Sequence, residues 1–410
     1  MPTPGESVPL AVEKPAAGGR MIARLGGRVV LVNGAIPGER VRARIERVGK
    51  GVIYADTTAI ESPSADRRTV VADPLCGGCL YAHIAYPRQL EIKSQIVADA
   101  FARIGRLALP AAVPVAPSPE EGYRMRARLH VRGRRAGFFR EGTHDVCDFR
   151  STRQLLAGTC DALDRFIAEL TSAGPAAARE IELSENVDAS ERVVSLDVWT
   201  GIDARARSRL AAIEGLTGVG PDASVADRIV VGSAPAVVLR RSVRSFFQGN
   251  RYLLNDLVAH VIGLVPEGAD LLDLYAGSGL FSVTAAAVRG ARVTAVEGDR
   301  AAAADLQVNA SACVDVAIHH LAVEEFFETE PKASGAVVVD PPRTGLSRGA
   351  LGGVLGLRPS RVIYVSCDPA TLARDARRFV DGGYAIEQAA CFDLFPGTPH
   401  IETVAVFTPS

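Results

Sequence analysis

The chain has 410 residues, of which 48% are hydrophobic and 23% charged, and its formal net charge at pH 7 is −1. This balance indicates a globular protein with room for two or three domains, and it excludes an indiscriminate binder of polyanions. No apolar run is long enough to span a bilayer, and residues 1–15 lack the basic and apolar regions of a secretory signal, so we expect a cytoplasmic protein without membrane contact.

Short β-branched runs separated by Gly and Pro fill residues 9–63. The runs at 27–33, 38–45 and 51–55 have the length and spacing of strands. Strands this short and this close together predict a small β-barrel of the OB type, which we assign to residues 1–64.

The next segment, 65–244, has a mixed pattern that predicts a central, antiparallel α+β domain. Apolar residues at helical spacing predict helices at 86–104 and 159–171. Candidate strands lie at 124–131, 135–139 and 192–199. Residues 123–153 hold nine Arg against three acidic residues, which favours a phosphate-facing surface, although 42 Arg against four Lys in the whole chain also indicates a compositional bias.

From residue 245 to 410 strands and helices alternate, which predicts an α/β domain built on a doubly wound parallel sheet, a Rossmann-like arrangement. The strand candidates are 270–275, 292–297, 335–340 and 361–365. They are mostly continuous apolar runs, as expected for strands with both faces covered.

A Gly-rich turn follows the first of these strands. Gly277 and Gly279 let the backbone approach a ligand closely, and Glu297, at the end of the next strand, is suitably placed for a ribose diol. The turn could serve NAD, but the dinucleotide fingerprint requires Gly or Ala where this chain has Ser282. Asp273 before the turn is more typical of an S-adenosylmethionine (SAM) site.

Three further side chains follow strands of the same domain. Asp340 opens an Asp-Pro-Pro-Arg segment, whose Arg343 stands where amino-methylating enzymes often carry an aromatic residue. Cys367 follows the last apolar strand; alone it would be interpreted as a small buried residue, and Glu402 alone as a solvated charge. Together they suit pyrimidine chemistry. A thiolate adds to C6, C5 then accepts a methyl group, and a carboxylate removes the C5 proton.

These segments resemble the bacterial RNA (uracil-C5) methyltransferases that begin with a TRAM domain, in particular the 23S rRNA enzymes. The resemblance is carried by 273–279, 340–343, 365–375, 395–402 and the Ser-Phe-Phe-Gln-Gly-Asn segment at 245–250. It implies a TRAM barrel, a class I SAM methyltransferase domain, and an RNA substrate, ribosomal RNA rather than tRNA, acted on by a monomer. It also implies that Cys367 is the nucleophile and Glu402 the base. The residues implied to hold SAM are Gln248, Tyr275, Gly277, Gly279, Glu297 and Asp340.

Relatives that act on ribosomal RNA commonly bind a [4Fe–4S] cluster through four cysteines, and here the chain departs from the pattern. Cys76 and Cys79 match two of them, whereas Val70 and Thr152 stand at the other two positions; Cys147 lies five residues before the latter. A cubane needs four thiolates or a substitute ligand. We therefore expect the cluster to be absent or degraded, with no other metal.

Two departures concern the cofactor pocket, since Leu280 and Ala322 replace residues that are often polar in relatives. They leave open an RNA-binding protein with a vestigial SAM fold. Methylation of a uridine in tRNA also stays open. Methylation of cytosine is disfavoured, because the Asp340 segment carries no second cysteine.

Overall fold

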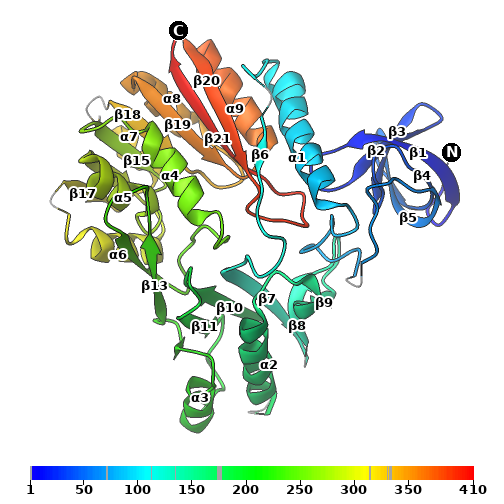
Figure 1. The fold of residues 1–410 in the computed structure, drawn as a ribbon, viewed down its shortest axis with the longest axis horizontal. Helices are drawn as coiled ribbons and strands as arrows, with labels where there is room; N and C mark the ends of the chain where they lie inside the picture. Colours follow the sequence, from blue (N-terminus) through cyan, green and yellow to red (C-terminus); the bar gives the residue numbers. More distant parts are fainter. Residues whose placement is uncertain are drawn as a thin grey trace.

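The fold is given by a computed structural model that describes residues 2–70, 73–111, 113–133, 135–172, 178–313, 315–329, 331 and 335–410. Its strands form a closed barrel, a six-stranded sheet, a two-stranded hairpin and an eight-stranded sheet. Figure 1 shows the barrel beside α1, the six-stranded sheet below, and the eight-stranded sheet with its helices above. The multidomain architecture predicted from the sequence is confirmed, whereas the divisions after residues 64 and 244 stay predictions.

The barrel contains five strands in the order β1-β2-β3-β5-β4, and pairing of β1 with β4 closes it. Their bounds are β1 Ser7–Pro15, β2 Met21–Leu25, β3 Arg28–Asn33, β4 Arg40–Val48 and β5 Val52–Ser62. In β4, Val41, Ala43 and Ile45 are buried while the arginines between them are exposed, as period-two alternation requires. The predicted barrel is confirmed; β1 and β2 were not among the predicted runs, because Pro9 interrupts the strand signal of β1.

The central sheet has the order β12-β11-β10-β7-β8-β9 and is antiparallel except for the β11–β12 pair. Its strands are β7 Arg126–Arg132, β8 Arg135–Phe139, β9 Val146–Asp148, β10 Glu180–Glu185, β11 Arg192–Leu196 and β12 Gly218–Val219. Helices α2 (Ala157–Ser172) and α3 (Ala204–Ala211) pack on it through an apolar cluster of their own. The hairpin β13 (Ser224–Ile229) and β14 (Val237–Ser242) was not predicted.

The eight-stranded sheet has the order β17-β16-β15-β18-β19-β21-β20-β6. Its bounds are β15 Asp270–Leu274, β16 Arg292–Val296, β17 Val316–His319, β18 Ala336–Val339, β19 Arg361–Ser366, β20 Tyr384–Phe392, β21 Glu402–Pro409 and β6 Val115–Ala116. The four predicted strands form β15, β16, β18 and β19 and run parallel, as predicted; β17, which was not predicted, also runs parallel, whereas β21 is antiparallel to both β19 and β20. The sheet is therefore mixed, and its last hairpin was not predicted.

Helices cover both faces of this sheet. One face packs against α4 (Leu254–Leu264), α5 (Leu280–Arg289) and α6 (Arg300–Ala310). The other packs against α1 (Tyr86–Ala100), α7 (Val323–Glu328), α8 (Arg348–Leu357) and α9 (Pro369–Asp381). Val338 faces the first core, and Val337 and Val339 the second, which is the alternation of a strand buried on both sides.

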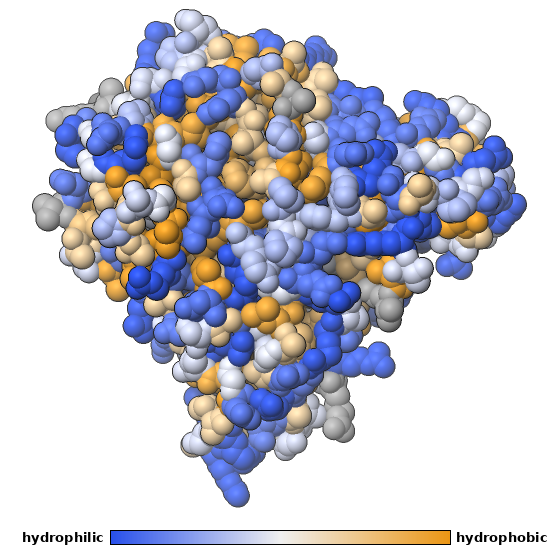
Figure 2. Space-filling model, in the orientation of Figure 1, coloured by the Kyte–Doolittle hydropathy of each residue, from blue (hydrophilic) through white to orange (hydrophobic). Residues whose placement is uncertain are grey.

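Residues that precede position 245 complete this α/β core. The predicted helix 86–104 forms as α1 followed by a π-helical turn at Phe101–Gly105, and both contribute to the second apolar core. Strand β6 pairs in parallel with β20 at the sheet edge. Figure 2 shows a mostly hydrophilic face, with hydrophobic residues gathered mainly over the α/β part. Among the described residues, no helix is long and apolar enough to cross a membrane.

Candidate active site

The predicted site residues meet at one edge of the eight-stranded sheet. Glu297, Asp340 and Cys367 directly follow the parallel strands β16, β18 and β19, so all three lie at their carboxyl ends. Glu402 reaches the same edge from the opposite direction. β21 is antiparallel to β19, and Ser366 pairs with Thr403. In this register Glu402, the first residue of β21, lies at the end of β19 that leads to Cys367.

The turn after β15 has the backbone that its glycines predict. Gly277 and Gly279 have φ values of 58° and 94°, in the left-handed region. A Cβ on Gly279 would lie 2.8 Å from the Leu306 Cδ1, so the turn packs directly against α6. Tyr275 also has a positive φ of 63°, which is uncommon for an aromatic residue and typical of functional sites.

Glu297 is held by the backbone of the two loops that meet at it. The Gly277 N–H donates a 2.7 Å hydrogen bond to Oε2 of Glu297, and the Asp299 N–H donates one of 2.6 Å to Oε1. This fixes the carboxylate next to the Gly-rich turn.

Ser282, which departs from the dinucleotide fingerprint, has a local role. Its hydroxyl donates a hydrogen bond to Oδ2 of the fully buried Asp273. The pKa of Asp273 is raised to about 7, chiefly by burial, and the hydrogen bond from Ser282 partly offsets the effect of burial. The nearby carboxylates of Asp340 and Glu297 also act to raise it.

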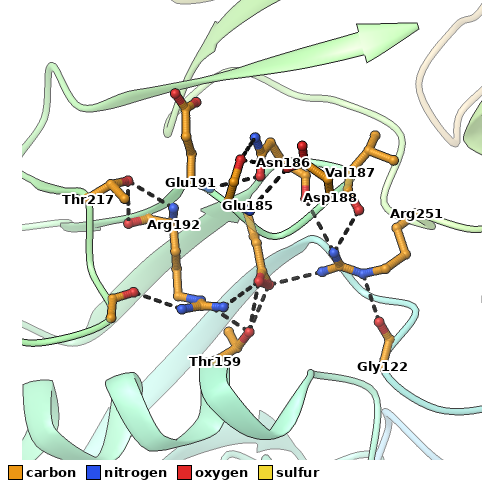
Figure 3. A network of polar contacts seen from close by, with 12 residues as sticks. Gly122, Thr159, Glu185, Asn186, Val187, Asp188, Glu191, Arg192, Thr217 and Arg251 are labelled. Atoms are coloured by element: carbon orange, nitrogen blue, oxygen red, sulfur yellow. Dashed lines mark hydrogen bonds and ion pairs between the residues drawn. The ribbon is translucent and has the colours of Figure 1, made fainter. Parts of the chain in front are cut away.

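Gln248 lies on a loop that brings the segment after β14 to the site. Its Nε2 donates a 3.2 Å hydrogen bond to Oδ2 of Asp340, whose pKa burial raises to about 7. The segment is anchored three residues later by Arg251. Figure 3 shows the anchor: Arg251 and Arg192 both pair with the buried carboxylate of Glu185, at 3.0 and 2.6 Å.

Cys367 and Glu402 share two charged neighbours, Arg343 and Asp340. The thiol is free and half-buried, and its pKa is raised to about 12. Burial is the main cause and the charges of Glu402 and Asp340 act in the same direction, while the Arg343 guanidinium beside it opposes the shift. Burial also raises the pKa of Glu402 well above its usual value, and Arg343 again opposes the shift. Arg343 is therefore the group that favours a thiolate at Cys367.

The site has the electrostatics of a pocket for a cation. Oδ1 of Asp273 and Oε1 of Glu402 are buried and have no hydrogen-bond partner in the described part of the chain. Carboxylates whose pKa values are raised by burial and by one another are stabilised when a positive ligand arrives. The sulfonium and ammonium groups of SAM meet this requirement, so the residues present fit that cofactor.

The predicted cluster cysteines gather elsewhere, on the loop before α1 and on β9. Cys76 and Cys147 form a disulfide, and Cys79 is a buried free thiol in the same small apolar cluster. Within the described residues, no group of three or more His, Cys, Asp or Glu side chains is arranged to hold a metal. These residues do not fit a four-thiolate cluster, and no step of the function below depends on one.

The two cofactor-pocket departures have different surroundings. The Leu280 side chain, at the start of α5, is buried in the first apolar core. Ala322 precedes α7, and its backbone N–H is 3.4 Å from Oε2 of Glu325.

The arginine-rich segment lines a concave surface beside β8. A hollow of about 820 Å³ is lined by Asp73, Arg132, Arg135, Arg140, His144, Asp145 and Val146. Arg140 is paired with Asp73 at 2.7 Å, whereas no ion pair is found for Arg132 or Arg135 among the described residues. The hollow offers positive charge to a phosphate backbone.

The residues that support the site from a distance were not predicted from the sequence. Lys93 and Asp393 form a fully buried ion pair, and Arg124 lies 5.6 Å from the centre of the Phe395 ring. A signal existed for Lys93, because it stands among the apolar positions of a helix. Its partner, 300 residues later, leaves no local trace.

Comparison with known proteins gives consistent results. Residues 223–408 match the family described as tRNA (Uracil-5-)-methyltransferase, and residues 3–57 match the TRAM domain. The chain is 33% identical to an uncharacterized RNA methyltransferase of Corynebacterium efficiens, over 99% of this chain and 96% of the relative. It is 32% identical to the 23S rRNA (uracil(1939)-C(5))-methyltransferase RlmD of Thiobacillus denitrificans, over 95% and 96%.

A solved structure covers nearly the whole fold. The tRNA (uracil-54, C5)-methyltransferase of Pyrococcus abyssi, in complex with S-adenosyl-L-homocysteine, superposes with a TM-score of 0.70 at 25% identity. The match covers 98% of this chain and 100% of the other.

Proposed function

The chain belongs to the family of SAM-dependent RNA (uracil-C5) methyltransferases, and on this premise we propose that it methylates C5 of a uridine in structured ribosomal RNA through a covalent adduct with Cys367. The target base leaves its stack to enter the pocket, because C6 and C5 are out of reach in a stacked helix. We further propose that the enzyme acts as a cytoplasmic monomer.

The proposed steps use residues at the sheet edge. The Cys367 thiolate, favoured by Arg343, forms a bond to C6, and the electrons of the C5=C6 double bond make C5 nucleophilic. SAM, when bound, supplies the methyl group for C5 and leaves as S-adenosylhomocysteine. The Glu402 carboxylate then takes the C5 proton. The electron pair of that C–H bond restores C5=C6, and the Cys367 thiolate is released.

The pairing of β19 with β21 carries this proposal. It brings a free cysteine and a buried carboxylate together from positions 35 residues apart in the sequence, with Arg343 beside both. Gln248, Tyr275, Gly277, Gly279, Glu297 and Asp340 would hold SAM on the other side of the reacting base. The raised pKa of Glu402 suits a group that must accept a proton in a water-poor pocket.

The similarity to the Thiobacillus enzyme, which is named as a 23S rRNA methyltransferase and matches this chain over nearly its whole length, favours ribosomal RNA as the substrate. The five-stranded barrel and the basic hollow beside β8 offer a surface for a large RNA. The archaeal structure is named for tRNA, so uridine in tRNA is the second candidate. Both substrates use the same chemistry.

Trapping with 5-fluorouridine tests the mechanism, because fluorine at C5 cannot leave as a proton. The protein, SAM and fluorinated 23S rRNA fragments or tRNA are expected to give an adduct that survives a denaturing gel. The Cys367→Ser variant should form none, whereas Cys313→Ser, at a free thiol outside the site, should behave as wild type. SAM binding without any adduct would refute the covalent route. Absence of both SAM binding and methyl transfer would favour a vestigial RNA-binding protein.

A further inference from the structure

The loop between β20 and β21 leads directly to Glu402, and buried donors hold four of its backbone carbonyl oxygens in turn. The donors come from separate parts of the chain. They are Asn250 Nδ2 to Leu394 at 3.1 Å, Lys93 Nζ to Phe395 at 3.1 Å, Tyr123 Oη to Pro396 at 3.2 Å, and the Tyr81 N–H to Gly397 at 2.7 Å. All four donor residues are fully buried, so water does not compete for these bonds.

Lys93 makes the most costly of these contacts. Its ammonium group pairs with Asp393, and both side chains have zero exposure. Burial lowers the pKa of Lys93, while the charge of Asp393 opposes the shift. A buried ion pair is often no more stabilising than apolar residues of the same volume, so stability alone does not explain why this pair is present. Its presence is explained if the pair holds the loop in one geometry.

A second contact comes from one turn earlier on α1. Oε1 of the buried Gln89 accepts a 2.9 Å hydrogen bond from the Gly397 N–H, while its Nε2 donates to the carbonyls of Tyr81 and Ile84. Lys93 thus holds the start of the loop, and Gln89 holds its tip. One face of α1 therefore determines where the loop lies.

The end of this loop sets the catalytic groups. His400 Nε2 lies 3.5 Å from a guanidinium nitrogen of Arg343, the group beside Cys367. The pKa of His400 is lowered to about 4, chiefly by burial, and the positive charges of Arg343, Lys93 and Arg124 act in the same direction. His400 is therefore a neutral neighbour of Arg343. Glu402 follows two residues later, so a shift of the loop displaces the base.

We propose that Lys93, through its ion pair with Asp393, is a positioning residue for proton removal by Glu402, with Gln89 in support. The inference rests on the proposed function, since it assigns these residues to the step that ends the covalent adduct. It predicts a specific defect. If Glu402 is misplaced, Cys367 still adds to C6 and the base is still methylated, but elimination is slow.

The test compares three variants with ordinary uridine RNA and SAM. Lys93→Met with Asp393→Leu removes the buried pair and keeps its volume. Glu402→Gln is the reference for a lost base. Lys14→Met with Asp99→Leu is the matched control, because Lys14 of β1 forms a partly exposed ion pair, at 2.6 Å, with Asp99 of α1, the helix that carries Lys93. Readouts are kcat and KM for RNA, the unfolding temperature, and the fraction of RNA in a covalent adduct on a denaturing gel.

We expect the buried-pair variant to lose about 100-fold in kcat, since a shift of about 1 Å at the chemistry costs that much, with KM for RNA unchanged. It should accumulate the methylated adduct, as Glu402→Gln should, while the control should resemble wild type. The inference is overturned if the buried-pair variant shows wild-type turnover and no adduct while Glu402→Gln accumulates the adduct. That outcome leaves the proposed function intact. Wild-type turnover in Glu402→Gln overturns the function itself.

A second variant keeps the inference testable if the buried-pair variant does not fold. Gln89→Met removes the hydrogen bonds to the loop tip without removing a charge. We expect it to lose about tenfold in kcat, because the ion pair remains, and to show the same adduct in smaller amount. Wild-type kcat in Gln89→Met, with no adduct, would then overturn the inference.

Discussion

Replacing Glu185 with Gln is expected to destabilise the protein strongly, because one buried carboxylate compensates two arginines. Glu185 has no exposed surface and pairs with Arg192 and Arg251, whose side chains are only 11% and 5% exposed. Thr159 donates to the same carboxylate at 2.8 and 3.0 Å. The amide keeps the volume but leaves two nearly buried guanidinium groups without a counter-charge, which costs about 3–5 kcal/mol.

The same strand supplies a matched control. Glu182, three residues earlier on β10, pairs with Arg128 at 2.8 Å, but Arg128 is 55% exposed. Exposed pairs of this kind contribute about 0–1 kcal/mol, so Glu182→Gln should change stability little.

The two variants are compared by thermal unfolding and by urea midpoints. At roughly 2–4 °C per kcal/mol for a domain of this size, Glu185→Gln should lower the unfolding temperature by on the order of 10 °C and Glu182→Gln by less than about 4 °C. Equal losses in both variants, or no loss in Glu185→Gln, would refute the reasoning that burial sets the cost of this network.

Three further predictions concern the site. Gly277→Ala should bind S-adenosylhomocysteine several-fold more weakly, because residue 277 has a positive φ that alanine adopts only with strain. Gly279→Ala should lose far more affinity and have a lower unfolding temperature, because its new Cβ would also clash with Leu306. Equal affinities of the two variants in calorimetry would contradict this prediction. Arg343→Gln should raise the pKa of Cys367, so the rising limb of a pH–rate profile for adduct formation should move to higher pH, and an unmoved limb would exclude the role. Affinity for SAM should increase as the pH rises through about 7, because Asp340 binds a cation only when ionised, and Asp340→Asn should flatten that dependence.

The same raised pKa values have a consequence for the ligand-free protein. A carboxyl group whose folded pKa lies above its unfolded pKa stabilises the fold fully below the unfolded value, and this contribution is lost as the pH rises through the folded value. For Asp273 that window runs from about 4 to about 7. Ligand-free protein should therefore lose stability across this window, and saturating SAM should reduce the loss.

Local sequence patterns predicted the parts of the site that follow continuous apolar strands. The turn at Gly277 and the positions of Glu297, Asp340 and Cys367 depend only on where parallel strands end, and those ends are visible in the sequence. The partnership of Cys367 with Glu402 was inferred from the chemistry of the two side chains and from the family resemblance. The hairpin that places Glu402 was not predicted, because β20 carries a mixed burial pattern and a long loop joins it to β21. The Lys93–Asp393 pair could not be predicted, because no pattern in the sequence around either residue indicates its partner.

The contribution of α1 and β6 to the second apolar core also bears on synthesis of the chain. Val97, Phe101 and Val115 belong to that core, yet the strand that β6 joins begins at Tyr384. At about 5–20 residues per second, a nascent chain presents these side chains on the order of tens of seconds before their partners leave the ribosome. The first third of the protein must therefore wait, with an uncovered apolar helix face, for the last strands. Fragments that end before β20 are expected to be captured by chaperones or to aggregate, whereas the barrel, whose strands are all local, can close at once.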